Sequence, residues 1–185
     1  MTSTPPRSRR SDILVAAERE FASAGFSGAR VERIAAAAGV NKQLLFHYFG
    51  SKEGLFAAAL DVLLARLEPT HHDTGSPVEE LRSMLATLQD AALERPGLVG
   101  IVADACANPD FPRGPLDSLR SWLDRVRTRL GDVIAEGQRR GYFRDDIDPA
   151  AIAQLGLGAA LGAGALGRDH GAPVATFIAD HCAWR

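Results

Sequence analysis

The spacing of apolar residues, which repeats with the period of an α-helix along almost the whole chain, is the strongest constraint on the fold. The first such stretch has Ser11 as a candidate N-cap and Gly25 as a stop. Its apolar residues fall on one helical face: Ile13, Leu14, Ala17 and Phe21. No stretch shows the apolar–polar alternation of a half-buried strand, so the sequence predicts an all-α protein.

Glycine, proline and capping residues divide the periodic stretches into separate helices. We expect helices over residues 31–38, 42–49, 52–68, 77–95, 116–140 and 149–166, a short one around 101–102, and a last one from about 173. The chain has 185 residues, 46% hydrophobic and 24% charged, which is the composition of a soluble globular protein. The first ten residues lack the apolar core of a secretory signal, so a reducing cytoplasm is expected.

The segment 31–49 has the pattern of a helix-turn-helix: a helix, the Gly39-Val40 turn, and a short second helix ending before Gly50. Asn41 is a good N-cap for the second helix. On that helix Leu45 and Phe49 share one side, while Gln43 and His47 point the opposite way, flanked by Leu44. A helix this short needs tertiary anchoring, and the anchored face leaves the polar face rigidly presented to a DNA groove.

Charge is unevenly distributed along the chain. Residues 1–54 contain eight Lys and Arg and five acidic residues, a net charge of +3, which leaves 13 basic and 18 acidic residues elsewhere, a net −5. A basic N-terminal segment on an acidic body favours a polyanion as partner for that segment. From geometry alone, an ordinary helical hairpin with solvated polar side chains is an equal alternative.

The stretch "GFSGARVERIAAAAGVNKQLLFHYFGSKEGLF" resembles the DNA-binding signature of the tetracycline-repressor-like (TetR) family of transcriptional regulators. The match covers roughly residues 10–56, and "AEGQRRGYFRDDIDPAAIA" is similar to the family's crossing between its last long helices. The resemblance implies a helix-turn-helix DNA-binding domain over residues 1–50 and a ligand-sensing and dimerisation domain over 51–185. It further implies a repressor that a small molecule releases from a palindromic operator.

Carried over by position, the resemblance assigns DNA contacts to eight residues. Those that fall where the family meets base edges are Lys42, Gln43, Leu44 and His47. Those that fall at the phosphate backbone are Arg30, Phe46, Tyr48 and Lys52. Gln can bond an adenine edge, Lys a guanine or a phosphate, and Leu44 can touch a thymine methyl group. Phe46 lacks a tyrosine's hydroxyl group, and Arg30 replaces the usual threonine.

The resemblance also implies an effector cavity between the middle helices, lined mainly by apolar residues and suited to a largely apolar small molecule. The candidate lining residues are Leu67, Met84, Leu88, Val102, Cys106, Phe111 and Trp122. A plain hydrophobic core is the alternative for most of them. Only sparse polar groups, Gln89, Asp104 and Asn108, are available to orient a ligand there.

Residues 149–167 carry no charge, but Ala and Gly rather than Leu and Phe dominate, so a homodimer interface is favoured over a membrane span. Small residues let helices approach closely, and the family's dimer uses its last two helices. The candidate interface residues are Gln154, Leu155, Gly158, Leu161, Gly162 and Phe177.

The sequence gives little indication of a metal site or a catalytic site. His71-His72-Asp73 fits a polar linker better than a metal site, no serine has a nucleophile-elbow setting, and Cys106 fits a buried thiol. We therefore expect no metal, no cofactor and no enzyme activity. Two other functions stay open: a non-specific architectural DNA binder, and a helical enzyme or small-molecule carrier with a vestigial DNA-binding motif.

Overall fold

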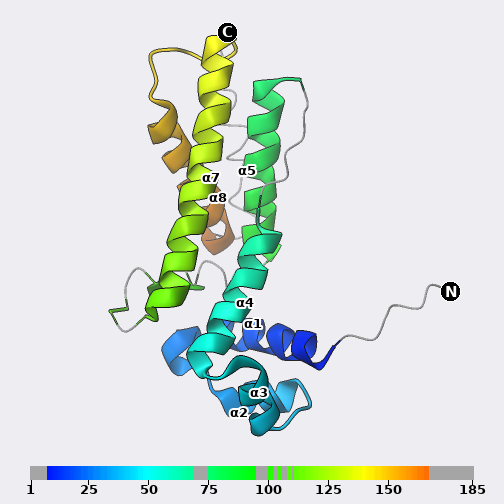
Figure 1. Ribbon diagram of the computed structural model, residues 1–185. Coiled ribbons are helices and arrows are strands. Elements are labelled where there is room, and N and C mark those ends of the chain that lie inside the picture. Colours follow the sequence, from blue (N-terminus) through cyan, green and yellow to red (C-terminus); the bar gives the residue numbers. More distant parts are fainter. Residues whose placement is uncertain are drawn as a thin grey trace, which may run out of the picture. The chain divides into compact units, whose positions relative to one another are not determined.

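The computed structural model describes residues 8–68, 75–94, 100–101, 104–105, 108–109 and 111–166. Each regular element in these ranges is a helix, as the periodicity predicted (Figure 1). The helices are α1 (Arg9–Gly28), α2 (Val31–Ala37), α3 (Lys42–Phe49), α4 (Lys52–Arg66), α5 (Pro77–Glu94), α7 (Arg113–Arg139) and α8 (Pro149–Leu166). The all-α prediction is confirmed, while the expected linker at 71–73 and the helix from residue 173 lie outside the described residues.

The chain forms two compact units. The first comprises residues 1–66 together with 100–119, and the second comprises 67–99 and 120–185. The unit that contains the helix-turn-helix therefore extends past residue 50 and takes in α4 and a segment from the middle of the chain. The division of function at residue 50 stays a prediction.

In the first unit, α1 begins three residues earlier than expected, and the assignment of Ser11 as its N-cap is wrong. Ser8 is the N-cap, and its hydroxyl oxygen accepts a hydrogen bond from the Ser11 backbone N–H at 3.2 Å. Arg9 and Arg10 are good helix formers, so the helix can extend by a turn to a serine that caps equally well. At the other end, Gly25 (φ 66°) is non-helical and interrupts α1 where the stop was predicted, and a short helical stretch continues beyond this kink to Gly28.

The core of the first unit is a cluster of phenylalanine rings. Phe56 on α4 lies edge-on to Phe21 of α1 with ring centroids 4.7 Å apart, and Phe111 lies edge-on to Phe56 at 5.4 Å. Phe26 completes the cluster, 5.3 Å from Phe56 and 6.5 Å from Phe111. Edge-to-face geometry is the favoured one for such rings. These contacts join α1 and α4 to the 100–119 segment.

A polar contact joins the same segment to the kink in α1. The Phe26 backbone N–H donates to Oδ2 of Asp104 at 3.1 Å, and Nδ2 of Asn108 donates to Oγ of Ser27 at 3.2 Å. The kink frees the Phe26 N–H from helical bonding, and the Asp104 carboxylate satisfies it. Asp104 and Asn108, expected as polar groups for a ligand, are thus engaged in holding α1.

In the second unit, α5 packs on α8, and α7 turns back to α8 through a short connection (Figure 1). Phe143 in this connection is fully buried. A Cβ on Gly137 would lie 2.1 Å from the Phe143 ring, so only glycine fits there. Nε2 of Gln138 donates to the backbone oxygens of Arg144 and Ile147 at 2.7 and 2.8 Å, which fixes the turn before Pro149.

The start of α7, which lies in the first unit, shifts slightly from expectation. Helix α7 begins at Arg113 rather than near Leu116, since Pro115 is accommodated in a first turn, where its missing N–H is not needed. Helix α8 spans Pro149–Leu166, as expected. Within the described part of the chain, none of the helices combines the length and apolar character needed to cross a bilayer.

Candidate nucleic-acid interface

The turn between α2 and α3 is fixed by backbone hydrogen bonds and a left-handed glycine. Gly39 has φ 64°, and the Val40 N–H donates to the Ala35 oxygen at 3.0 Å. Residues with a Cβ rarely adopt that φ, so the sequence places glycine where the chain must reverse. Asn41 then caps α3, its side-chain oxygen accepting from the Leu44 N–H at 2.7 Å. Both positions are as predicted.

The inner face of α3 anchors the helix. Leu45 is fully buried, and Phe49 is half-buried with the Arg10 guanidinium 5.3 Å from its ring centroid. Helix α3 packs against both α2 and α4. An eight-residue helix has too few internal hydrogen bonds to be stable alone, so this burial is what holds it.

The outer face of α3 presents donors and acceptors to solvent. Gln43 and His47 are exposed, which confirms that they share the outward face, and Tyr48 beside them is 43% exposed. The His47 and Tyr48 rings lie edge-on at 5.8 Å, while Leu44 and Phe46 are half-buried at the flanks. The arrangement is that of a rigid element offering polar side chains to a major groove.

The basic residues around α3 are partly engaged. Nζ of Lys42 lies 2.5 Å from Oε1 of Glu32 on α2. Nζ of Lys52 donates to the Ser27 backbone oxygen at 3.2 Å and lies 4.9 Å from the Phe26 ring centroid. Arg30 is exposed at the N-cap of α2. All eight candidate DNA-binding residues therefore belong to the first unit, and their contacts with bases and phosphates stay a prediction.

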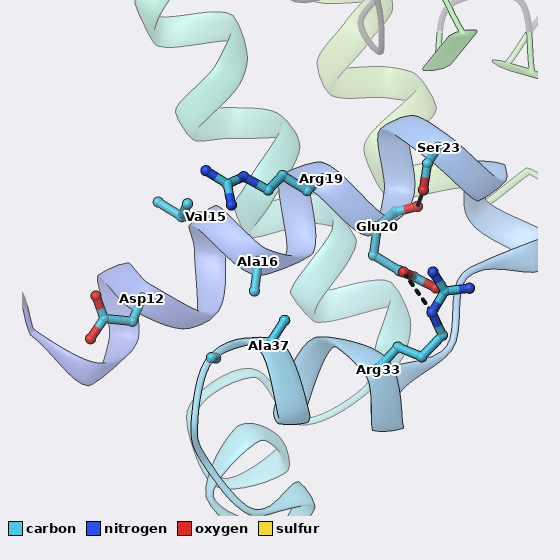
Figure 2. A pocket seen from close by; sticks show the side chains of 9 residues that line it. Asp12, Val15, Ala16, Arg19, Glu20, Ser23, Arg33 and Ala37 are labelled. Carbon is cyan, nitrogen blue, oxygen red and sulfur yellow. Dashed lines mark hydrogen bonds and ion pairs between the residues drawn. The ribbon is translucent and has the colours of Figure 1, made fainter.

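A buried carboxylate sets the position of α2 against α1. Glu20 is 8% exposed and lies beside a cavity of about 440 Å³ that α1 and α2 line. Figure 2 shows Glu20 facing Arg33 there, with Oε2 of Glu20 3.3 Å from Nε of Arg33. Its other oxygen accepts the Arg30 backbone N–H at 3.1 Å. The ion pair and this bond hold the start of α2, and with it the helix-turn-helix.

Sequence reasoning missed the two acidic partners in this region, Glu20 and Glu32. Each pairs with a residue on another helix, ten or more positions away. Helical periodicity does not indicate such a partner, so the sequence shows these residues only as two negative charges. The signal available was weak: single acids opposite Arg33 and Lys42 in a segment that is otherwise basic.

The candidate effector-lining residues divide between the two units. Leu67, Met84, Leu88 and Trp122 are buried in the second unit, whereas Phe111 packs on Phe26 and Phe56 in the first. Val102 and Cys106 lie outside the described residues. Within the described part of the chain, the buried indole Nε1 of Trp122 has no hydrogen-bond acceptor, and Gln89 is buried in the same unit. A ligand cavity at these residues stays a prediction.

Among the described residues, the candidate dimer residues of α8 lie on one face of the helix, which is largely exposed. Leu155 is 65% exposed, Gln154 and Gly158 are exposed, and Leu161 and Gly162 are half-buried. A Cβ built on Gly158 or Gly162 meets no atom of the described chain. The opposite side of α8 is buried through Ala153, Leu157 and Ala160. Phe177 lies outside the described residues.

An all-α protein with an anchored, outward-facing second helix in a helix-turn-helix belongs to the class of DNA-binding regulators. Comparison with known proteins gives the family. The family model described as "Bacterial regulatory proteins, tetR family" matches residues 13–59. The chain belongs to the TetR family and is a DNA-binding transcriptional regulator.

Relatives of similar length support this assignment. The chain is 32% identical to the HTH-type transcriptional repressor NicS of Pseudomonas putida over 142 residues, covering 75% of this chain and 67% of that protein. It is 40% identical to the repressor AcnR of Corynebacterium efficiens over 161 residues, covering 84% and 79%. A solved HlyIIR mutant shares the fold, with TM-score 0.81, 18% identity and 96% of each chain covered.

Proposed function

We propose that the protein is a repressor that binds a palindromic operator as a homodimer and leaves it when a small molecule binds the second unit. The observation that carries the proposal is α3, which is anchored by Leu45 and exposes Gln43, His47 and Tyr48. The relatives NicS and AcnR are named transcriptional repressors, which favours repression over activation here.

A homodimer explains the face of α8 that is exposed in the described part of the chain. Leu155 and the glycines at 158 and 162 give an apolar, sterically open surface on which a second copy can pack closely. Two copies related by a two-fold axis carry two α3 helices. Their half-sites must then lie about one helical turn apart or a multiple of it, which makes the operator an approximate palindrome.

Release by an effector requires a ligand that binds the DNA-competent and the DNA-incompetent dimer with different affinity. The buried residues Leu67, Met84, Leu88 and Trp122 favour a largely apolar molecule. The indole N–H of Trp122 is a donor that a ligand acceptor can satisfy, since buried polar groups are nearly always hydrogen-bonded.

Footprinting of the purified full chain on the DNA flanking its own gene tests the function. We expect a protected site of two inverted half-sites and a footprint that the Gln43→Ala/His47→Ala double variant loses. The Asp61→Ala variant, which changes an exposed residue of α4 in the same unit, is the matched control and should keep the footprint. Protection that spreads evenly over all sequences and vanishes with modest salt would indicate a non-specific binder instead.

A further inference from the structure

An acidic side chain lies within the helix-turn-helix. Glu32 is in the first turn of α2 and Lys42 is the first residue of α3, and their side chains meet with Oε1 and Nζ 2.5 Å apart. Nζ of Lys42 also lies 5.6 Å from the Phe46 ring centroid. The two helix starts therefore present a donor and an acceptor side by side.

The pair is too exposed to serve mainly as a stabilising contact. The Glu32 side chain is 65% exposed and that of Lys42 is 51% exposed, and ion pairs at such positions contribute little to folding. The hydrogen bond from Lys42, together with the backbone N–H of Glu32, keeps the pKa of the Glu32 carboxyl group below its usual value. The carboxylate is then ionised at neutral pH and acts only as an acceptor.

A G·C base pair has the complementary arrangement on its major-groove edge. Guanine O6 is an acceptor and cytosine N4 carries a donor hydrogen. These two atoms are joined by a hydrogen bond of the base pair, so they lie about 2.9 Å apart. A lysine that donates to O6 and a glutamate that accepts from N4 can therefore bind together without separating from each other.

We propose that Glu32 and Lys42 act as one unit that reads a single G·C base pair in each operator half-site. The inference rests on the proposed function, in which α3 enters the major groove. A carboxylate is repelled by phosphates, so Glu32 also disfavours registers in which the pair would face the backbone. Without Glu32, Lys42 can donate equally to a guanine or to a phosphate. Glu32 is the residue that makes the contact specific for a G·C base pair.

Selection of binding sites from a random duplex library by the full chain tests the inference. The variants are Glu32→Gln, which keeps the shape and removes the charge, and Lys42→Met, which keeps the stem and removes the donor. Glu53→Gln is the matched control, because it removes the same charge from an exposed residue in the first turn of α4. Circular dichroism confirms that each variant keeps its helical content.

We expect the unaltered chain and Glu53→Gln to select the same G·C pair in each half-site. Glu32→Gln and Lys42→Met should both lose discrimination at that position alone, by about 5- to 150-fold, the range of one good base contact. Unchanged preference in Glu32→Gln, or losses at different base pairs in the two variants, would overturn the inference while leaving the function intact. A chain that selects no site at all would overturn both.

Discussion

At the scale of the single residue, the groups around α3 differ in how firmly the free protein holds them. Lys42 and Lys52 each have a partner on another part of the unit, Glu32 and the Ser27 backbone oxygen. Gln43 and His47 extend from a helix whose backbone is fixed by Leu45. A backbone that is already fixed confines the conformational entropy lost on binding to the side chains, which favours tight recognition.

The first residue-scale prediction concerns base reading. Gln43→Ala and His47→Ala should each weaken operator binding by about 1–3 kcal/mol while leaving non-specific DNA binding in place, because base contacts specify and phosphate contacts only position. Titrations with operator and with scrambled duplex at one salt concentration measure both. Equal losses of affinity for the two duplexes would mean that these side chains contact the phosphate backbone of the DNA instead.

The second residue-scale prediction concerns Asp104. Replacing it with alanine leaves the part-buried Phe26 N–H without its acceptor, so the free energy of unfolding should fall by about 1–2 kcal/mol. Asp104→Asn keeps an oxygen at that position and is the control, with most of the stability retained. Urea denaturation of the three proteins gives the comparison. Equal stability of the alanine variant would show that water replaces the carboxylate at no cost.

At the scale of the element, local chemistry determined the helix ends that the sequence predicted well. Asn41, Gly39 and Gly50 act within three or four residues of themselves, and each lies where predicted, with both glycines at positive φ. Ser51, which precedes α4, accepts the Gly54 N–H at 3.0 Å and so acts over the same short range. Where two caps compete, as Ser8 and Ser11 do at α1, periodicity cannot choose between them, since both starts bury the same apolar face.

Contacts between elements were the part that the sequence did not reveal. Phe111 follows α5 by many residues and was expected near a ligand, yet its ring packs on Phe26 and Phe56 of the first unit. The Glu32–Lys42 and Glu20–Arg33 pairs join residues of different helices. Helical periodicity reports which face of a helix is buried and not which neighbour covers it, so such partners require the tertiary fold.

The element-scale prediction concerns the cap of α3. Asn41→Ala removes the side-chain acceptor of the Leu44 N–H and should lower the free energy of unfolding by about 0.5–2 kcal/mol. Because α3 has only eight residues, fraying of its first turn should also weaken operator binding. Asn41→Ser retains a capping oxygen and is the control. Denaturation and operator titration together test the cap, and a normal affinity in the alanine variant would show that DNA itself orders the turn.

At the scale of the whole molecule, the sequence predicted the first unit in more detail than the second. In the first unit, short-range signals and the family resemblance identified the helix-turn-helix, whose exposed and buried faces lie as expected. In the second unit, the sequence indicated an apolar body, but buried side chains such as Leu88 and Met84 look alike in a core and in a ligand pocket. Among the described residues of this unit, the exposed face of α8 is the feature that bears on assembly.

The whole-molecule prediction concerns that face, through Gly158. A Cβ at this position meets no atom of the described residues, and glycine in a helix interior is disfavoured by roughly 1 kcal/mol relative to alanine, so substitution should not harm the fold of the chain. Gly158→Leu nevertheless places a bulky side chain at the proposed dimer interface, and the two protomers should separate. Gly158→Ala is the matched control and should remain dimeric.

Sedimentation velocity and operator titration on the same samples measure both consequences of Gly158→Leu. We expect a helical monomer of undiminished helical content that binds a single half-site but has lost the tight binding of the palindrome. The loss follows from effective concentration: the second α3 is no longer tethered to the first, so its binding reverts to an independent event. A Gly158→Leu protein that stays dimeric and binds the palindrome normally would place the dimer interface elsewhere on the chain.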